Sequence, residues 1–600
     1  MENQHQTGQT GLAIIAVLAS VALVHAAWWW LSDSVVAHGN LVDSDGYARL
    51  VRVLRLVETG DWFNVSLPRA NWPYGGSLHW TRPLDVLLIG LALPMATFVG
   101  FAKALFWAGV LISPLLHGLA AVTLMWAARP LIGAGASVVA GMLSAVAFGV
   151  LGYATIGHAD HHVLVGLVAV AAFGFTLRAL VSPGDAARHA LSAGWVLAFG
   201  VWVGTEIQVT AGLCFGVAAL KWAVQDGGGG LAVNRRMALG FLLGLIAALV
   251  IERGPGVWTV QYDRLSIVHV TLGALIFGLW SALGFAPLKR AWARLAAGAI
   301  GGGVIFAGMV ALFPKVLVSP LIDVAPVMLE IFASVAEYAP VPDPWHFLVY
   351  AGGVILALPW AVMQVVRSHE PERWGWLLLV AGLVVYTLFA VNWIRWSLYV
   401  GLFSTVALAH MMMRAEALFD DFAPAVRVTG KVWLLLLIAV GPFAVGMAGI
   451  ASTSSPAGTR EFVDGDPRPC PVQAMSRFLN RAPWGDRPRM ILASANDGAE
   501  LLYRTPHRVM GTLHHPNTQG IIDSIRILSG TDDFKTLALM RQRRVDLVLV
   551  CRRWGGDAYR AVEGNLYQRL LDGDAPGWLA EVALPEVLGT AFRLYTVAEP

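Results

Sequence analysis

The stretch GHADHHVLVGLVAVAAFGFTLRALV, residues 157–181, sets one acid and three histidines directly before a long apolar run. A helix that crosses a bilayer needs about 20 apolar residues, and the run supplies that length. Charged groups this close to a membrane are costly and usually mark function. The stretch therefore predicts a membrane protein with a functional site at the end of a span.

The composition of the whole chain extends this prediction. Of its 600 residues, 57% are hydrophobic and 14% are charged, and the mean hydropathy is +0.63. A soluble domain carries roughly 25% charged residues, so we expect a polytopic membrane protein and not an anchored soluble enzyme. The net charge of +3, without a basic run, excludes nucleic acid as a partner.

The apolar runs predict about thirteen membrane-spanning helices. The first is interpreted as a retained helix because no basic segment precedes it, as it would in a signal peptide. A further apolar stretch, residues 86–100, is short and contains Pro94. We interpret it as lying in the interface or re-entering, and not as crossing. The predicted spans are residues 11–31, 104–126, 131–152, 163–181, 191–205, 207–225, 236–251, 266–286, 292–314, 346–366, 374–391, 396–413 and 430–450.

The distribution of basic residues then predicts the orientation. If residues 86–100 do not cross, most Lys and Arg of the short loops fall on one face, for example Arg129, Arg178 and Arg236. The positive-inside rule makes this face cytoplasmic, so the N-terminus is inside and the C-terminal region outside. The Gly-, Ala-, Val- and Arg-rich composition suggests a high-GC bacterium, in which the protein would lie in the inner membrane with a periplasmic C-terminal domain.

Two outer loops are long. Residues 32–103 include apolar side chains at helical spacing, which predicts an amphipathic helix lying on the membrane. The aromatic residues Trp72, Tyr74 and Trp80 follow; they could stack on sugar, but we favour the membrane interface. Residues 315–345 form the second long loop, and their apolar content argues against disorder. The apolar side of the predicted helix holds Leu50, Val53, Leu54 and Val57, and the opposite side holds Arg49, Arg52 and Arg55.

The chain therefore divides into a transmembrane domain, residues 1–450, and a C-terminal domain, residues 451–600. The second has strand-like runs at 490–493, 509–513, 546–551 and 592–597 alternating with helical runs at 498–503, 520–528 and 534–543, which predicts a small α/β domain. Cys470 and Cys551 lie in this domain, and the sequence leaves open whether they pair.

Three acidic clusters are predicted to meet at the outer face. They are DSDGY (residues 43–47), GHADHH (157–162) and SVAE (334–337). Their carboxylate and imidazole groups suit Mg²⁺ or Mn²⁺, with the histidine favouring Mn²⁺; Zn²⁺ is less suited because thiolates are missing. The alternative is structural, because Asp43 or Asp160 could cap a helix. The candidate ligands are Asp45, Asp160, His162 and Glu337.

Arg395 interrupts the apolar run VNWIRWSLYV, residues 391–400. It could snorkel to the interface, or it could hold a phosphate or a substrate hydroxyl. The sequence leaves both open.

The order of these motifs resembles the GT-C superfamily of lipid-dependent glycosyltransferases, and within it the catalytic subunit of oligosaccharyltransferases. The resemblance implies that Asp45, Asp160 and His162 bind a divalent metal, that Glu337 helps to bind metal and acceptor, and that Arg395 contacts the donor. It also implies that residues 86–100 do not cross the membrane.

The C-terminal domain departs from that family. Oligosaccharyltransferases carry a Trp-Trp-Asp motif that reads the hydroxyl of the Asn-x-Ser/Thr acceptor. Here the matching residues are Ala495, Asn496 and Asp497, followed by Gly498. The resemblance implies that Asn496, Asp497 and Gly498 bind the acceptor, although both tryptophans are replaced.

The predicted function is metal-dependent transfer of a saccharide from a polyprenyl phosphate or pyrophosphate donor to an acceptor at the outer membrane face. Asp45 and Glu337 are the predicted catalytic residues. The acceptor is a protein, as for an oligosaccharyltransferase, or else a lipid, a lipopolysaccharide or another glycan. Two other classes stay open, a transporter and a non-catalytic glycan-binding protein. The nearly charge-free span interiors count against a transporter. The sequence does not indicate an oligomeric state.

Overall fold

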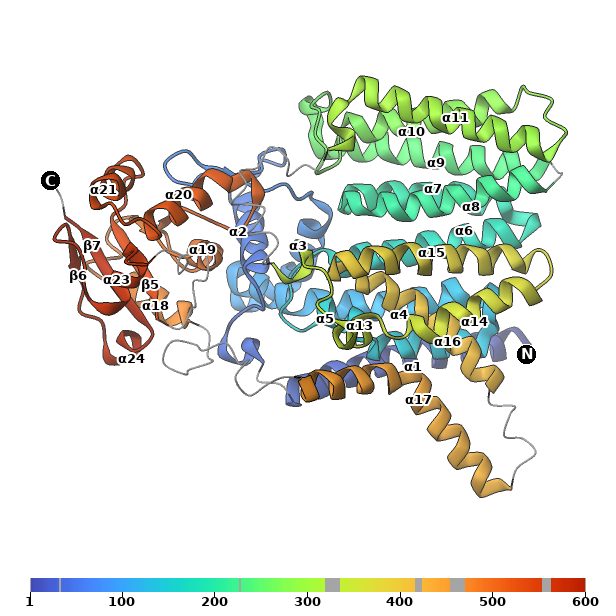
Figure 1. Cartoon of the computed structure of the whole chain (residues 1–600), viewed down its shortest axis with the longest axis horizontal. Coiled ribbons are helices and arrows are strands. Elements are labelled where there is room, and N and C mark those ends of the chain that lie inside the picture. The colour runs from blue at the N-terminus through green and yellow to red at the C-terminus, as the bar shows by residue number, and fades with distance from the viewer. Residues whose placement is uncertain are drawn as a thin grey trace.

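The computed structural model describes residues 2–31, 34–225, 228–318, 335–415, 423–453, 470–552 and 563–598. It consists of a helical bundle and a C-terminal unit, residues 470–598, that packs against one end of the bundle (Figure 1). The N-terminus lies at the opposite end of the bundle from this unit. We call the region where the two parts meet the junction.

Every predicted span has a helix at its place in the bundle, but fewer than the predicted thirteen are long and apolar enough to cross a membrane in the part of the chain that the structure describes. Among the described residues, nine helices are long and apolar enough to cross a membrane, or ten if α13 and α14, bent by 62°, form one span. Each predicted span falls on a helix of the bundle, with residues 131–152 covered by the second half of α4 and by α5 (Phe148–Ala154). The bundle helices are α1 (Glu2–Leu31), α4 (Phe101–Val146), α6 (His162–Val181), α7 (Ala186–Val203), α8 (Gln208–Val224), α9 (Gly228–Arg253), α10 (Ile267–Leu283), α11 (Ala291–Leu312), α13 (Pro344–Ala351), α14 (Val354–Arg367), α15 (Glu372–Asn392), α16 (Ser397–Ala415) and α17 (Pro424–Thr453).

Small residues allow the bundle helices to approach closely. A Cβ atom on Gly194 of α7 would lie 2.1 Å from the carbonyl oxygen of Met237 on α9, and one on Gly240 would lie 2.3 Å from that of Leu191. Lipid tails are as apolar as the side chains between helices, so close packing of small residues is what holds such helices together. A bulkier side chain at either glycine would push α7 and α9 apart.

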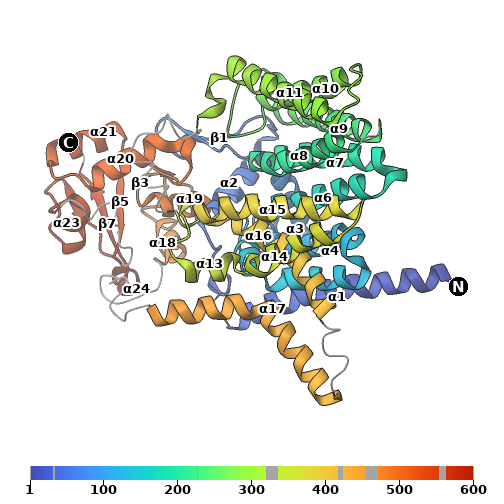
Figure 2. The same cartoon turned by 45° about the vertical axis from the view of Figure 1, so that its right-hand side comes forward.

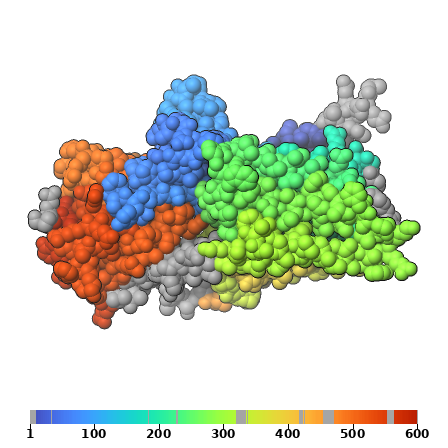
Figure 3. Space-filling model, turned by 90° about the horizontal axis from the view of Figure 1, so that it is seen from above, coloured from blue at the N-terminus to red at the C-terminus, as the bar shows by residue number. Residues whose placement is uncertain are grey.

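Residues 34–100 cover the junction. Helix α2 (Ser44–Thr59) runs across the ends of the bundle helices and packs against α19 of the C-terminal unit (Figure 2). The short strands β1 (Ser66–Leu67) and β2 (Gly76–Ser77) form a hairpin beyond it. Helix α3 (Pro83–Val99) packs against α4, and the light-blue surface of this part of the chain stands out from one side of the molecule near the junction (Figure 3). The interpretation of residues 86–100 as non-crossing stays a prediction.

The C-terminal unit is a mixed sheet with helices around it, as predicted. Its strand order is β4-β3-β5-β7-β6, with β4, β3 and β5 parallel and β7 antiparallel to both of its neighbours. Cys470 and Cys551 form a disulfide, which settles the pairing that the sequence left open. The strands are β3 (Met490–Leu492), β4 (Arg508–Val509), β5 (Leu547–Cys551), β6 (Leu579–Glu581) and β7 (Phe592–Val597), and the helices are α18 (Val472–Leu479), α19 (Ala495–Arg504), α20 (Thr518–Leu528), α21 (Asp533–Gln542), α23 (Leu566–Asp572) and α24 (Glu586–Gly589).

Strand β4 is shorter than the predicted run at 509–513. After Val509 the chain leaves the sheet and turns toward the bundle, and residues 513–515 end beside the junction cavity. The predicted fold class, a polytopic helical membrane protein with a small C-terminal α/β region, is confirmed.

Candidate active site

A cavity of about 720 Å³ lies at the junction. Its walls come from segments far apart in the sequence: the start of α2, the loop before α6, the loop before α10, the segment around Glu337, and the C-terminal unit. All three acidic clusters reach it, through Asp45, Asp160 and Glu337 among others. Ser334, the first residue of the third cluster, lies outside the described residues.

The start of α2 is tied to the loop that carries Asp160. Asp43 caps the helix, because its Oδ1 accepts a hydrogen bond from the Gly46 amide at 2.7 Å, so the structural alternative holds for this residue. Its other oxygen lies 2.9 Å from His158 Nε2. Burial disfavours the charged imidazole, but the Asp43 carboxylate outweighs this and raises the pKa of His158 to about 9. The resulting ion pair fixes Asp45, in the first turn of the helix, relative to Asp160.

Asp160, His162 and Glu337 form the centre of the cavity wall. His162 Nε2 lies 3.1 Å from Asp160 Oδ2 and 3.0 Å from Glu337 Oε2, so both carboxylates turn toward one atom. Asp160 Oδ1 lies 2.7 Å from His161 Nδ1. Glu337 reaches this point from the short 3-10 helix η6 (Ala336–Tyr338). The structure thus brings together residues separated by 177 positions, the interval from Asp160 to Glu337.

The environment moves the pKa values of the two aspartates in opposite directions. Burial alone would raise the pKa of Asp160, but the neighbouring imidazoles of His161 and His162 outweigh it and hold that pKa well below its usual range. Desolvation raises the pKa of Asp45, and the imidazole of His514 beside it opposes that rise only in part. Two carboxylates of one cavity therefore differ in their readiness to carry charge.

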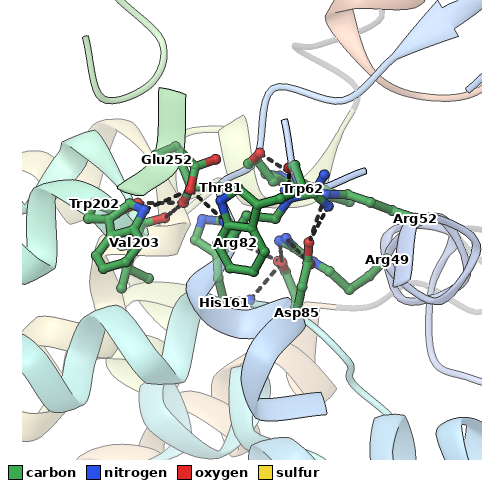
Figure 4. Close-up of polar contacts among 12 residues, drawn as sticks. Arg49, Arg52, Trp62, Thr81, Arg82, Asp85, His161, Trp202, Val203 and Glu252 are labelled. Atoms are coloured by element: carbon green, nitrogen blue, oxygen red, sulfur yellow. Dashed lines mark hydrogen bonds and ion pairs between the residues drawn. The ribbon is translucent and has the colours of Figure 1, made fainter. Parts of the chain in front are cut away.

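Beneath the cavity, three buried arginines surround Asp85 on α3 (Figure 4). The distances to its carboxylate oxygens are 3.4 Å from Arg49, 2.9 Å from Arg52 and 3.1 Å from Arg82. Arg49 also lies 3.8 Å from Asp160 Oδ1 and stacks on Trp80 at 4.0 Å from the ring centroid. This corrects the interpretation of α2 as an amphipathic helix lying on the membrane, because residues of both its arginine side and its apolar side are buried in the protein.

The physical reason for that correction is the carboxylate of Asp85, which the periodicity of α2 alone could not indicate. A buried guanidinium is tolerated only when paired, and Asp85 supplies the partner from another helix. Arg49 and Arg52 are 1% and 2% exposed, whereas Val57 of the supposed membrane-facing side is 47% exposed. Of that side, Leu50 and Val53 are fully buried in the core.

Arg395 lines the cavity and has a protein partner. It lies in the 3-10 helix η7 (Ile394–Trp396), where its guanidinium pairs with Glu206, and Tyr399 donates a hydrogen bond to the same carboxylate at 3.0 Å. The Tyr338 ring lies 5.3 Å from its guanidinium carbon. Arg395 therefore points into the cavity and does not snorkel toward the bilayer.

Of the three predicted acceptor-binding residues, one lines the cavity and two do not. Asn496, near the start of α19, lines the cavity. Asp497 and Gly498 are not among the lining residues, and a Cβ on Gly498 would lie 2.0 Å from the carbonyl oxygen of Gly511. Gly498 is therefore required for the packing of α19 against the chain that leaves β4.

Several residues that sequence reasoning missed also line the cavity. His514 and His515 reach it from the C-terminal unit, and Asp263 from the loop before α10. The sequence carried one signal for them, the adjacent histidines of HHP at 514–516. Of the aromatic residues in the first loop, Trp80 lines the cavity, whereas Trp72 stacks on Arg508 of the C-terminal unit and not in a membrane interface.

Within the described ranges, no group of three or more His, Cys, Asp or Glu side chains is arranged so that it could hold a metal ion. The donor chemistry around His162 still matches the predicted ion, because carboxylate oxygens and an imidazole nitrogen are ligands of Mn²⁺ and Mg²⁺. Asp160 and Glu337 already point at a common atom.

Comparisons with known proteins bear on the fold. No family model matches the sequence, and no curated protein matches it. Solved structures do match: the oligosaccharyltransferase AglB from Archaeoglobus fulgidus, in complex with an inhibitory peptide and a dolichol-phosphate, has a TM-score of 0.69 at 13% identity over 91% of this chain and 70% of its own. The same archaeon's enzyme tethered to an acceptor peptide with the NVT sequon has a TM-score of 0.65 at 14% identity, over 98% of this chain and 74% of its own.

The chain has a GT-C-like fold. Its architecture resembles that of oligosaccharyltransferase catalytic subunits, as the motif order predicted. ArnT from Cupriavidus metallidurans also matches, with a TM-score of 0.41 at 14% identity over 99% of this chain and the whole of its own. In this GT-C-like fold the cavity lies where the bundle meets the C-terminal unit.

Proposed function

We propose that the protein is a membrane glycosyltransferase that moves a saccharide from a polyprenyl phosphate or pyrophosphate donor to an acceptor. The observation that carries the proposal is the convergence of Asp45, Asp160, His162, Glu337 and Arg395 in one cavity of a GT-C-like fold. The archaeal oligosaccharyltransferase structure with a TM-score of 0.69 contains a dolichol-phosphate, which supports a lipid-linked donor.

Asp45, Asp160, His162 and Glu337 would hold a divalent cation, Mn²⁺ or Mg²⁺. When bound, the cation supplies Lewis-acid stabilisation of the negative charge on the leaving phosphate. One related structure was solved with Zn and sulfate, which supports cation binding in this fold without selecting the ion. Arg49 and His161 hold Asp160 in its ionised form for this role.

The remaining residues position the two substrates. Arg395 binds the phosphate or sugar of the donor, exchanging its contact with Glu206 for one with the ligand. Asp45 or Glu337 orients the acceptor group that attacks the anomeric carbon. Trp80 forms an aromatic wall of the same cavity.

An acceptor other than protein is the second candidate. Asn496 faces the cavity where oligosaccharyltransferases have a tryptophan, and the unit's other cavity residues are Leu513, His514 and His515. This surface lacks the aromatic pair that reads a sequon hydroxyl. Transfer of a sugar to a lipid, a lipopolysaccharide or another glycan therefore remains a specific alternative within the same chemistry.

The proposed setting is the inner membrane of a bacterium. The transmembrane domain is residues 1–450 and the C-terminal domain residues 451–600. The gathering of Lys and Arg in the loops away from the junction supports a cytoplasmic N-terminus and a periplasmic C-terminal domain.

The test compares cells whose only copy of the protein is wild type, Asp160→Asn or Asp185→Asn. Asp185 is the matched control, because it is exposed at the other end of α6. Mass spectrometry surveys periplasmic glycopeptides and surface glycans together. If the protein is an oligosaccharyltransferase, Asn-linked glycopeptides are lost in the Asp160→Asn cells and kept in the Asp185→Asn cells. If a lipid or polysaccharide modification is lost instead, the second candidate function is identified. Unchanged glycopeptides and glycans would overturn the proposed transfer.

A further inference from the structure

The loop GTLHHPN, residues 511–517, carries the C-terminal unit's contribution to the cavity. Its own hydrogen bonds fix its shape: the Asn517 amide donates to the His514 carbonyl at 2.8 Å, and Asn517 Nδ2 donates to Thr512 Oγ1 at 2.6 Å. Asn517 also ties the loop to the bundle side, because its Oδ1 accepts from the Ser77 amide at 3.1 Å. The loop therefore holds its side chains in a defined place.

His514 is the innermost side chain of this loop. It is 1% exposed, and its Nε2 lies 3.3 Å from Asp45 Oδ1. Its ring meets Trp80 edge-on, with 4.8 Å between the ring centroids. In the part of the chain that the structure describes, neither ring nitrogen has a partner of good hydrogen-bond geometry, so the Asp45 carboxylate is the nearest acceptor that His514 has.

The neighbouring histidine makes different contacts. His515 Nε2 lies 2.9 Å from Asp263 Oδ2, in the loop before α10, and its ring lies 4.2 Å from that of His79. His515 thus joins the C-terminal unit to a second loop of the bundle without contacting any of the proposed cation-holding residues. A substitution of His515 therefore tests the docking of the unit, whereas a substitution of His514 tests the contact with Asp45.

We propose that His514 is a positioning residue that orients the Asp45 carboxylate, so that the C-terminal unit completes the cation site of the bundle. The inference rests on the proposed function, because it needs Asp45 to hold the cation. His514 Nε2 lies 3.3 Å from Oδ1 of Asp45, so it would hold that oxygen and leave the other carboxylate oxygen for the cation. A carboxylate ligand that is fixed by an outer hydrogen bond binds its metal more tightly than one that rotates freely.

This arrangement gives the C-terminal unit a role besides acceptor contact. The Asp45 side chain is 34% exposed and lines the cavity. Among the described side chains, His514 makes the contact that holds its carboxylate, and without His514 the carboxylate would be free to rotate. A bundle without the docked unit would keep Asp160, His162 and Glu337 in place but would hold Asp45 loosely. Cation affinity therefore depends on the unit being docked.

The test is calorimetric titration of Mn²⁺ into the purified full-length protein in detergent, as wild type, His514→Ala, His514→Gln and His515→Gln. Removal of an outer partner of this kind weakens metal binding about 10- to 100-fold, which is the expectation for His514→Ala. Glutamine keeps a donor near the position of Nε2, so His514→Gln recovers most of the affinity. His515→Gln changes the affinity far less than His514→Ala does.

The outcomes separate this inference from the proposed function. If the wild type does not bind Mn²⁺, the cation model fails and the inference fails with it. If the wild type binds and His514→Ala binds equally tightly, His514 has no positioning role, while the proposed function stands. An equal loss in His514→Ala and His515→Gln would assign the effect to docking and would also overturn the inference.

Discussion

The end of the helical bundle and the C-terminal unit both line the cavity, but they do so in different ways. The bundle contributes charged groups that are embedded in an apolar sequence, such as Asp160 and Arg395. The C-terminal unit contributes Asn496 and His514, which stand among many other polar residues. A charged side chain in an apolar segment is costly to bury and therefore indicates function. For this reason the sequence predicted the bundle's residues of the site but not those of the C-terminal unit.

The buried ion group of the bundle and the docking contact of the C-terminal unit also differ in how their charges are held. In the bundle, Arg49, Arg52 and Arg82 converge on Asp85 in a fully buried group. At the docking contact, an arginine donates instead to neutral backbone carbonyls: Arg69 of the first loop donates to Leu502 and Thr505 at 2.8 and 2.7 Å. The first kind of contact is costly to break, and the second is weaker and spread over several bonds.

The largest effect is expected from the buried group. Arg52→Met removes a guanidinium 2.9 Å from Asp85 without touching Asp160, and should destabilise the bundle by about 3 kcal/mol or more, because it breaks a buried ion pair from one side. The thermal unfolding midpoint in detergent measures this. Arg55→Met is the matched control on the same helix: Arg55 is half-buried with a 3.2 Å hydrogen bond to Ser66, and its loss should cost about 1 kcal/mol. Equal effects of the two variants would contradict the account.

This buried group shows what periodicity misses. The spacing of apolar residues gave α2 correctly as a helix but assigned Arg49 and Arg52 to water. Only the fold brings Asp85, 36 positions from Arg49, into contact with them. The spans, the strand-then-helix start of the C-terminal unit and the gathering of the acidic clusters followed from hydropathy and motif order. Some contacts join residues that are far apart in the sequence, such as Glu206 with Arg395 and His514 with Asp45. The sequence around each residue gives no indication of such a partner.

A smaller effect is expected at the docking contact. Arg69→Met leaves three carbonyl groups of the C-terminal unit without their charged donor, those of Leu502, Thr505 and His507. Hydrogen bonds to charged groups contribute roughly 1.5–3 kcal/mol, so the variant should loosen docking by about that amount. Limited proteolysis then releases the C-terminal unit faster than in the wild type. Arg526→Met, which alters an exposed arginine of the same unit, should leave the cleavage rate unchanged; a comparable rise there would refute the docking role.

The smallest effect is expected from pH in the C-terminal unit. Burial, with a further contribution from Glu500, raises the pKa of Asp497 from 3.8 to about 7. The folded state thus keeps a proton that the unfolded state loses, so this group's stabilisation is full below pH 4 and falls as the pH rises toward 7.

Asp497→Asn should remove that slope and stabilise the unit at pH 8 on the order of 1–2 kcal/mol, a value reduced for the half-buried position of the carboxyl. Thermal midpoints of wild type and variant at pH 5 and pH 8 provide the measurement. A wild-type midpoint with the same pH dependence as that of the variant would show that Asp497 is ionised at neutral pH in the folded protein.

We propose above all that the protein cleaves a polyprenyl-linked saccharide in this cavity. Cleavage of the donor is the most direct test, because the assay does not require the acceptor to be known. Purified wild type and Asp160→Asn are each given an undecaprenyl-linked saccharide with Mn²⁺. Water takes the place of the acceptor at the anomeric carbon, and release of the free saccharide and the lipid phosphate is followed by mass spectrometry. The account predicts release by the wild type, loss of release after chelation of the metal, and none above background with Asp160→Asn. Equal release by both proteins, or none by the wild type across lipid-linked donors of both phosphate classes, would contradict it.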